Sequence, residues 1–247
     1  MKMKSEMTMA TGNSCELILA LDLPDKIQAL NLLDRIDNEL TWVKVGLQMF
    51  TRWGPDLLNE VADRGYKIFL DLKLHDISNT VASTIESLSK CPVEMMTLHS
   101  LGGPEMINAA KEMRNSCGSQ VKLIAVTVLT SHDESTLAAI GLNGPIPQRV
   151  PALAEMAVTS GADGLVCSPL EVVPLREKLG SESLLITPGI RPIGSAVGDQ
   201  KRIMTPAEAA CAGSSFIVVG RPILQAQDPK NAALAIQTEL ASQRKNG

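Results

Sequence analysis

Charged side chains interrupt an apolar stretch near residue 70 of this 247-residue chain. Asp71, Lys73 and Asp76 follow the apolar run 68–70, and leucines alternate with the first two. Side chains of a β-strand alternate between its faces, so Asp71 and Lys73 are expected on one face and the leucines on the other. Burying such charges is unfavourable unless they pair or take part in chemistry. The spacing therefore predicts either a structural ion pair or charged groups of an active site.

Other residues that could act with this pair stand at or near the ends of further apolar runs. They are Asp22, Lys44, Thr130, which we expect to close a strand, Arg191, Gly220 and Arg221. One such residue alone is most often a solvated loop residue. In a barrel of parallel strands, however, the carboxyl ends of all strands meet at one mouth, where active sites are built. The set therefore predicts a site that several strand ends share.

The elements that must position these residues follow a repeated order. Apolar runs typical of strands span 16–23, 42–46, 67–74, 94–100, 121–130, 164–168, 184–189 and 216–220. Helical patterns span 25–38, 56–64, 104–114, 134–140, a segment after the turn-rich 141–151 that ends near 160, 170–179, 206–212 and 228–242. This alternation predicts one parallel TIM (β/α)8 barrel over residues 16–247, after a flexible N-terminal extension, 1–15. A doubly wound open sheet is the alternative, but its usual Gly-x-Gly-x-x-Gly segment after the first strand is absent.

Two glycine-containing segments follow the last two apolar runs. Residues 194–200 read Gly-Ser-Ala-Val-Gly-Asp-Gln, and residues 220–222 read Gly-Arg-Pro. Glycines let backbone N–H groups approach an anion, and an arginine adds a two-pronged donor. The loops after the seventh and eighth strands are the usual phosphate site of the barrel fold. We therefore expect a phosphate-bearing ligand there.

Composition excludes several classes of function. The chain is 45% hydrophobic but only 2% aromatic, which suits an aliphatic sheet covered by helices. A net charge of -4 provides no basic surface for nucleic acid. Five scattered cysteines without CxxC spacing predict neither a zinc site nor a disulfide framework and favour a reducing cytoplasm. No run is long enough to span a membrane, and the first fifteen residues do not resemble a signal peptide.

Several stretches, in order, resemble the motifs of the orotidine 5'-phosphate decarboxylase family in its bacterial, single-function form. The longest, Phe-Leu-Asp-Leu-Lys-Leu-His-Asp-Ile-Ser-Asn-Thr, spans 69–80. The others span 20–22, 44–46, 125–130, 187–192, 198–200 and 219–222. Ser78 stands where the family usually has proline. Because both residues suit the start of a helix, little effect on chemistry is expected.

The resemblance implies decarboxylation of orotidine 5'-monophosphate to uridine 5'-monophosphate and CO2, the last step of de novo pyrimidine biosynthesis, with no metal and no organic cofactor. By this resemblance, Lys73 stabilises the carbanion formed at ring carbon six and protonates it. Asp71 lies near the departing carboxylate and helps to hold Lys73. Lys44 and Asp76 complete an alternating row of charge, Lys44–Asp71–Lys73–Asp76.

The resemblance also implies partners and substrate contacts. It predicts an obligate homodimer in which Asp76 and Thr80 reach into the neighbouring subunit's site. The implied ligands are Asp22 for the ribose, Thr130 for the pyrimidine or a nearby loop, and Arg191, Gln200, Gly220 and Arg221 for the phosphate. The loop 191–200 is expected to close over the substrate, so that phosphate contacts contribute to lowering the barrier.

Two other functions remain open at this stage. A sister enzyme on the same barrel, a sugar-phosphate decarboxylase or aldolase, would keep Asp-x-Lys-x-x-Asp but use magnesium; Lys44 and the run 75–80 argue against it. A non-catalytic barrel that binds nucleotide phosphate would need the glycine-containing loops but not the charged row. His75 is interpreted as a structural, hydrogen-bonding residue, because no second histidine is near enough in sequence to suggest a metal pair. His99 is interpreted in the same way, with a place at the mouth of the site as the alternative.

Overall fold

The strands of the protein close into a single parallel barrel in the order in which they occur in the chain, from β1 to β8. This computed structural model describes residues 15–37, 39–192 and 204–242. The strands are β1 (Glu16–Ala20), β2 (Trp42–Gly46), β3 (Lys67–Leu74), β4 (Met95–His99), β5 (Lys122–Val126), β6 (Gly164–Val166), β7 (Leu184–Thr187) and β8 (Phe216–Val219). The predicted TIM barrel is confirmed. The division into an extension, 1–15, and one domain stays a prediction, since residues 1–14 lie outside the described part.

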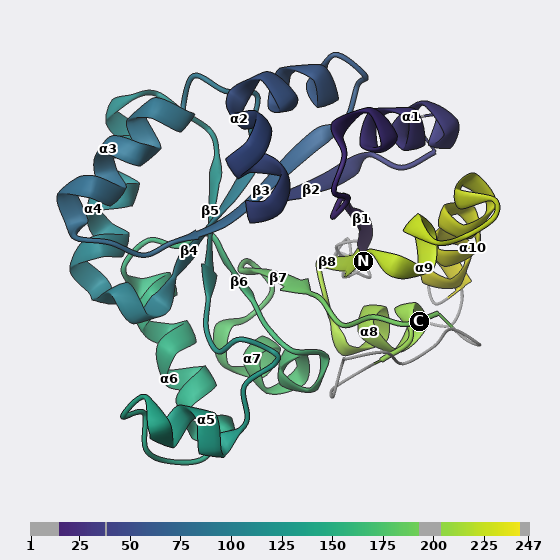
Figure 1. Cartoon of the computed structure of the whole chain (residues 1–247). Coiled ribbons are helices and arrows are strands. Elements are labelled where there is room, and N and C mark those ends of the chain that lie inside the picture. Colours follow the sequence, from purple (N-terminus) through teal and green to yellow (C-terminus); the bar gives the residue numbers. More distant parts are fainter. Residues whose placement is uncertain (1–14, 38, 193–203, 243–247) are drawn as a thin grey trace, which may run out of the picture.

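Helices surround the barrel (Figure 1). They are α1 (Lys26–Ile36), α2 (Leu47–Ala62), α3 (Ser78–Leu88), α4 (Gly103–Ser116), α5 (Glu134–Ala139), α6 (Ile146–Thr159), α7 (Val172–Leu179), α8 (Pro206–Ala212), α9 (Arg221–Leu224) and α10 (Pro229–Ser242), with the 3₁₀ turns η1 (Ser100–Gly102) and η2 (Pro169–Glu171). Polar side chains start several of them; the Asp25 carboxylate, for example, accepts a hydrogen bond from the Gln28 N–H at 2.9 Å. None of the helices in the described ranges has the length and apolar character needed to cross a bilayer.

Several boundaries differ from those predicted. Strand β1 ends at Ala20, so Asp22 lies beyond the strand and not within it. Strand β5 ends at Val126, because its ladders to β4 and β6 both end there, so Thr130 lies in a turn beyond the strand and does not close it. Helix α2 begins directly after β2 and bends at Gly54, whose φ of 52° suits glycine. Helix α6 starts at Ile146, inside the segment predicted as turns. Proline is tolerated in the first turn of a helix, because the N–H groups there have no partner within the helix.

Two apolar layers fix which side chains face the barrel mouth. One layer lies between the sheet and the helices, and the other fills the barrel. The inner layer comprises Ile18, Ala20, Trp42, Phe69, Met95, Ile124, Ile186, Phe216 and Val218. Lys44, Asp71 and Thr97 each stand two residues after a member of this layer, so the strand period brings them to the same inner face, nearer the carboxyl ends.

Candidate active site

Charged side chains form a continuous chain of ion pairs at the carboxyl ends of β1, β2 and β3. The Lys44 Nζ is 3.0 Å from an Asp22 carboxylate oxygen and 3.7 Å from one of Asp71. The Lys73 Nζ donates to the other Asp71 oxygen at 2.8 Å. The side chains of Lys44 and Asp71 are only 11% and 14% exposed. Because two ammonium groups alternate with two carboxylates, each charge has an opposite neighbour, including the two that are largely shielded from water.

Among the four ion-paired residues, Asp71 is contacted by both lysines and by Thr97. Burial alone would raise the pKa of its carboxyl group. The charges of Lys44 and Lys73, with hydrogen bonds from Lys73 and Thr97, outweigh burial and hold the pKa of Asp71 below its usual value. Asp71 is therefore ionised at neutral pH, although it lies inside the barrel mouth.

Lys73 adopts an unusual backbone conformation for a strand residue. Its φ of 52° lies in the left-handed region, and the register of β3 against β4 shifts between Leu70 and Leu74. The Thr97 hydroxyl on β4 accepts the Lys73 N–H at 2.8 Å and donates to Asp71 at 3.0 Å. Sequence reasoning missed Thr97; its one available signal is a lone hydroxyl within an otherwise apolar part of a strand.

Gly46 is a second residue that sequence reasoning did not single out for a role. A Cβ at this position would lie 3.0 Å from the Lys44 Nζ and 3.2 Å from an Asp22 oxygen. A side chain here would crowd both partners of the ion pair, so the absence of one leaves room for the contact between Lys44 and Asp22. The signal was present in the sequence, since Gly46 follows Lys44 by two residues.

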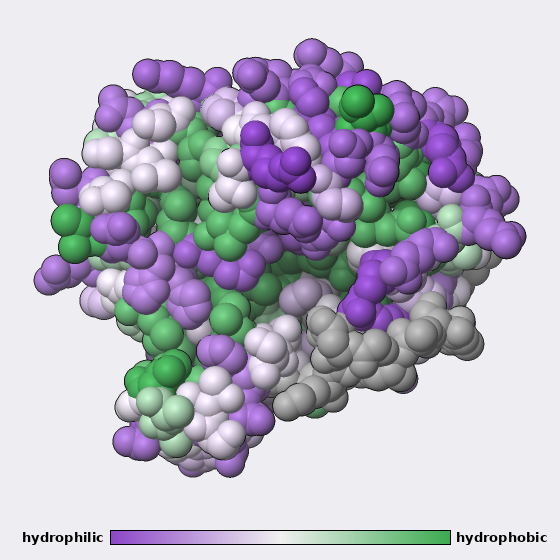
Figure 2. Space-filling view, in the orientation of Figure 1, coloured by the Kyte–Doolittle hydropathy of each residue, from purple (hydrophilic) through white to green (hydrophobic). Residues whose placement is uncertain are grey.

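The ion pairs line a cavity at the barrel mouth that has two adjoining parts. The larger part, about 430 Å³, is lined by Asp22 and Lys44 together with Arg191, Gly220 and Arg221. The smaller part, about 170 Å³, is lined by Lys44, Asp71, Lys73, Thr130 and aliphatic side chains. Lys44, Pro188 and Val218 line both parts. Figure 2 shows apolar side chains in the hollow centre of this view and mostly hydrophilic ones toward its rim.

The two arginines enter the larger part from neighbouring strand ends. Arg191 follows β7, is almost fully buried, and donates to the Ile190 carbonyl oxygen at 2.8 Å. Arg221 follows Gly220 after β8 and is the first residue of α9. Gln200, the remaining residue predicted to contact phosphate, lies outside the described residues, as does most of the predicted loop 191–200.

Comparison with known proteins shows the family to which the chain belongs. The sequence profile described as "Orotidine 5'-phosphate decarboxylase / HUMPS family" matches residues 16–236. The chain belongs to this family. A protein from Opitutus terrae named orotidine 5'-phosphate decarboxylase is 48% identical over 93% of this chain and 100% of its own. One of the same name from Rhodopseudomonas palustris is 50% identical over 92% of this chain and 94% of its own.

A solved structure agrees with the sequence comparisons. The crystal structure of orotidine 5'-phosphate decarboxylase from Lactobacillus acidophilus is similar with a TM-score of 0.82 and 43% identity, covering 92% of this chain and 99% of that one. The predictions of the orotidine 5'-phosphate decarboxylase family and of an enzyme, a carboxy-lyase, are therefore confirmed.

Two residues that the family resemblance assigned to the neighbouring subunit stand apart from the ion pairs. Asp76 lies in the exposed turn after β3, and its Oδ1 accepts the Ile77 N–H at 2.7 Å. Thr80 is exposed in the first turn of α3. Within the described ranges, no ion pair joins Asp76 to its own chain. In one chain the row therefore runs Asp22–Lys44–Asp71–Lys73.

Two histidines support the turn that carries Asp76. The rings of His75 and His99 stack with centroids 5.5 Å apart and planes 24° from parallel. The His99 Nδ1 accepts the Leu101 N–H at 3.2 Å, as the structural interpretation of this residue expects. Burial, followed by the charges of His75, Lys73 and His132, lowers the pKa of His99 to about 4. His99 therefore adds no positive charge beside Lys73 at neutral pH.

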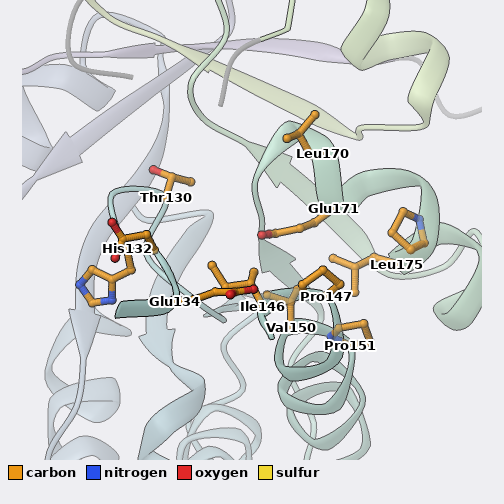
Figure 3. A pocket seen from close by; sticks show the side chains of 12 residues that line it. Thr130, His132, Glu134, Ile146, Pro147, Val150, Pro151, Leu170, Glu171 and Leu175 are labelled. Atoms are coloured by element: carbon orange, nitrogen blue, oxygen red, sulfur yellow. The ribbon is translucent and has the colours of Figure 1, made fainter. Parts of the chain in front are cut away.

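A separate cavity of about 440 Å³ lies on the other side of Thr130 (Figure 3). Its walls come from the segment after β5, from α6, and from the region of η2 and α7. Most of the lining is apolar, and the charged groups in it are the carboxylates of Asp133, Glu134 and Glu171. None of the described residues that line it is Lys or Arg, so it does not suit an anionic nucleotide. The cavity with the ion pairs is the candidate active site.

Proposed function

We propose that the protein converts orotidine 5'-monophosphate to uridine 5'-monophosphate and CO2, the last step of de novo pyrimidine biosynthesis. The observation that carries the proposal is the neutral chain of ion pairs at the barrel mouth, with the Lys73 ammonium 2.8 Å from the Asp71 carboxylate. Relatives that match almost the whole chain carry the name of this activity. A cytoplasmic location is part of the proposal and rests on the scattered cysteines.

The two parts of the cavity suggest how the substrate lies. The larger part offers two guanidinium groups and the start of α9, which suit a phosphate. The smaller part is narrow, largely aliphatic and carries the Asp71–Lys73 pair, which suits a flat pyrimidine. The ribose would then lie between them, beside Lys44 and Asp22. Thr130 borders the pyrimidine in this arrangement.

The reaction is difficult because its carbanion is poorly stabilised. When the bond between ring carbon six and the carboxylate breaks, CO2 leaves and the electron pair stays on carbon six. The Lys73 ammonium stabilises that charge and then donates its proton to carbon six. Asp71 holds Lys73 in place and faces the departing carboxylate. One pair of unit charges about 4 Å apart is worth roughly 4 kcal/mol at an effective dielectric constant near 20. Charges that are fixed before the reaction need no reorganisation during it.

The substrate test uses the intact protein after removal of metal ions. Orotidine 5'-monophosphate is added, and its ultraviolet absorbance is followed with and without a chelator. Conversion to uridine 5'-monophosphate at the same rate in both samples is expected. Turnover that requires added magnesium would favour the sister enzymes on this barrel, and binding without turnover would favour a non-catalytic barrel.

Replacing Arg221 by alanine is expected to weaken ligands that carry a phosphate. Loss of a two-pronged charged donor should raise the Kd of uridine 5'-monophosphate by about tenfold to a hundredfold. The Kd of uridine, which lacks the phosphate, should change much less. Calorimetric titration of both ligands measures the difference. Arg52→Ala is a suitable control, since Arg52 contacts the Pro24 carbonyl oxygen and does not line the cavity. An equal loss of affinity for both ligands would show that Arg221 does not bind the phosphate.

The dimer is also part of the proposal, and exposed apolar residues support it. Leu47 and Ile77, 53% and 72% exposed, follow β2 and β3, and the partly exposed Leu101 follows β4. They therefore follow three adjacent strands on one side of the mouth. Exposed apolar residues that gather on one side of a protein are typical of an interface. A two-fold contact on this side would bring Asp76 and Thr80 of each chain toward the other chain's cavity.

A further inference from the structure

The backbone of Lys73 requires a support that the sheet cannot supply. Among the described residues other than glycine, only Asp37 and Lys73 have a positive φ. Asp37 is the residue that ends α1, where the left-handed conformation is common. Lys73 instead lies within β3, next to the shift in register against β4. Because Leu70 pairs with Met96 and Leu74 with Leu98, β3 holds more residues than β4 over the same length, and the regular ladder is interrupted.

The Thr97 side chain fills this interruption. Its hydroxyl oxygen accepts the Lys73 N–H at 2.8 Å, at the point where the register of the ladder shifts. A hydroxyl has one proton to donate, and that proton is directed to Asp71 Oδ1 at 3.0 Å. The same carboxylate oxygen accepts the Lys73 Nζ at 2.8 Å. The backbone and the ammonium of Lys73 are therefore both tied to one hydroxyl–carboxylate pair.

Burial makes this arrangement hard to replace. Thr97 has no exposed surface, so solvent does not reach its hydroxyl. Without the hydroxyl, the Lys73 N–H would be left unpaired in a buried place, and Asp71 would lose a donor. The strained φ of Lys73 would then have less to maintain it.

We propose that Thr97 is a positioning residue, whose buried hydroxyl holds Lys73 in its left-handed conformation and orients the Asp71 carboxylate that binds the Lys73 ammonium. The inference rests on the proposed function, because the step it supports is the proton donation by Lys73. A displacement of the ammonium by about 1 Å is enough to slow such a step. Thr97 itself need not touch the substrate.

The test compares Thr97→Val, which keeps the shape and removes the hydroxyl, with Thr97→Ser, which keeps the hydroxyl. With orotidine 5'-monophosphate, T97V should lower kcat by about tenfold to a hundredfold and change KM by less than about threefold. T97S should stay within about threefold of the wild-type kcat. If T97V does not fold, Thr97→Ala provides the same comparison.

A pH profile separates positioning from a general loss of stability. Asp71 must be ionised for the reaction, and it is faced by Lys44 from β2, Lys73 from β3 and Thr97 from β4, with Asp22 beyond Lys44 and His99 beside Lys73. Loss of the Thr97 donor removes a contact that favours the ionised form, so the pKa of Asp71 rises. The acid limb of the kcat profile should therefore move to higher pH in T97V and should have its wild-type position in T97S.

A matched control removes another buried hydroxyl. Thr187 is fully buried, its hydroxyl is 2.8 Å from that of Ser214, and it is not among the groups that act on the charge of Asp71. Thr187→Val should lower the melting temperature without moving the acid limb. A T97V enzyme with wild-type kcat and an unmoved acid limb overturns the proposal.

Failure of the proposed function is distinguishable from failure of this inference. If the wild-type protein leaves orotidine 5'-monophosphate intact, the function is wrong, and crystal structures of wild type and T97V then decide the role of Thr97. A Lys73 that leaves the left-handed region, with an Asp71 carboxylate that rotates, supports positioning. A Lys73 and Asp71 that both stay in place overturn it.

Discussion

Lys73→Ala is expected to abolish decarboxylation while the protein still binds nucleotides. The Lys73 ammonium lines the smaller part of the cavity and is 2.8 Å from Asp71, whose other carboxylate oxygen is 3.7 Å from Lys44. Its removal takes away both the charge that stabilises the carbanion and the proton that the product needs. Loss of a single fixed electrostatic donor lowers rates by a factor of about 10² to 10³, and loss of the proton donor should lower kcat further.

Binding should survive because the phosphate contacts lie elsewhere. Arg191, Gly220 and Arg221 line the larger part of the cavity, which Lys73 does not reach. The Kd of uridine 5'-monophosphate, measured by calorimetry, should therefore stay within about tenfold of the wild-type value. Lys67→Ala is a matched control, because Lys67 begins the same strand and its ammonium lies over the Trp42 ring. Near-normal turnover in Lys73→Ala would reject the role assigned to Lys73.

The barrel could be predicted from the sequence because the pattern that produces it is repeated along the chain. Each apolar run alternates with a helical pattern, and a parallel strand buried on both faces reads as such a run. The same regularity predicted the faces of β3: Leu72 and Leu74 pack toward the helices, and Asp71 and Lys73 line the cavity. The strand boundary that was wrong, at Thr130, depends on where the neighbouring ladders end, which a single segment does not reveal. The start of α6 was wrong because the prolines near residue 146 suit a turn and the first turn of a helix equally well.

The contacts within the site were beyond sequence reasoning for a different reason. A strand pattern assumes an extended backbone, so the left-handed Lys73 could not be foreseen. Thr97 lies on β4, and its importance arises only from the shift in register between β3 and β4. Asp22 was predicted as a ribose ligand, but its 3.0 Å contact with Lys44 depends on the pairing of β1 with β2. Such contacts follow from tertiary register, which one sequence does not encode in any local pattern.

The position of Asp76 leads to the second prediction of large effect. Asp76 is exposed and makes no ion pair with its own chain in the described ranges, although it stands only three residues beyond Lys73. If it serves the cavity of a partner, each site uses Lys73 from one chain and Asp76 from the other. Asp76→Ala and Lys73→Ala should then each inactivate the enzyme alone. A mixed dimer, however, should contain one site that has both native residues.

Unfolding and refolding the two variants together tests this arrangement. Random pairing of equal amounts should restore about one quarter of the wild-type activity, because half of the dimers are mixed and one of their two sites is complete. A mixture of Lys73→Ala with Asp71→Ala is the matched control. Asp71 and Lys73 pair within one chain, so a mixed dimer of these variants has no complete site and should recover nothing. Two differently tagged chains allow the mixed dimers to be isolated. If isolated mixed dimers of the first pair are inactive, Asp76 serves its own chain, and the shared site must be abandoned.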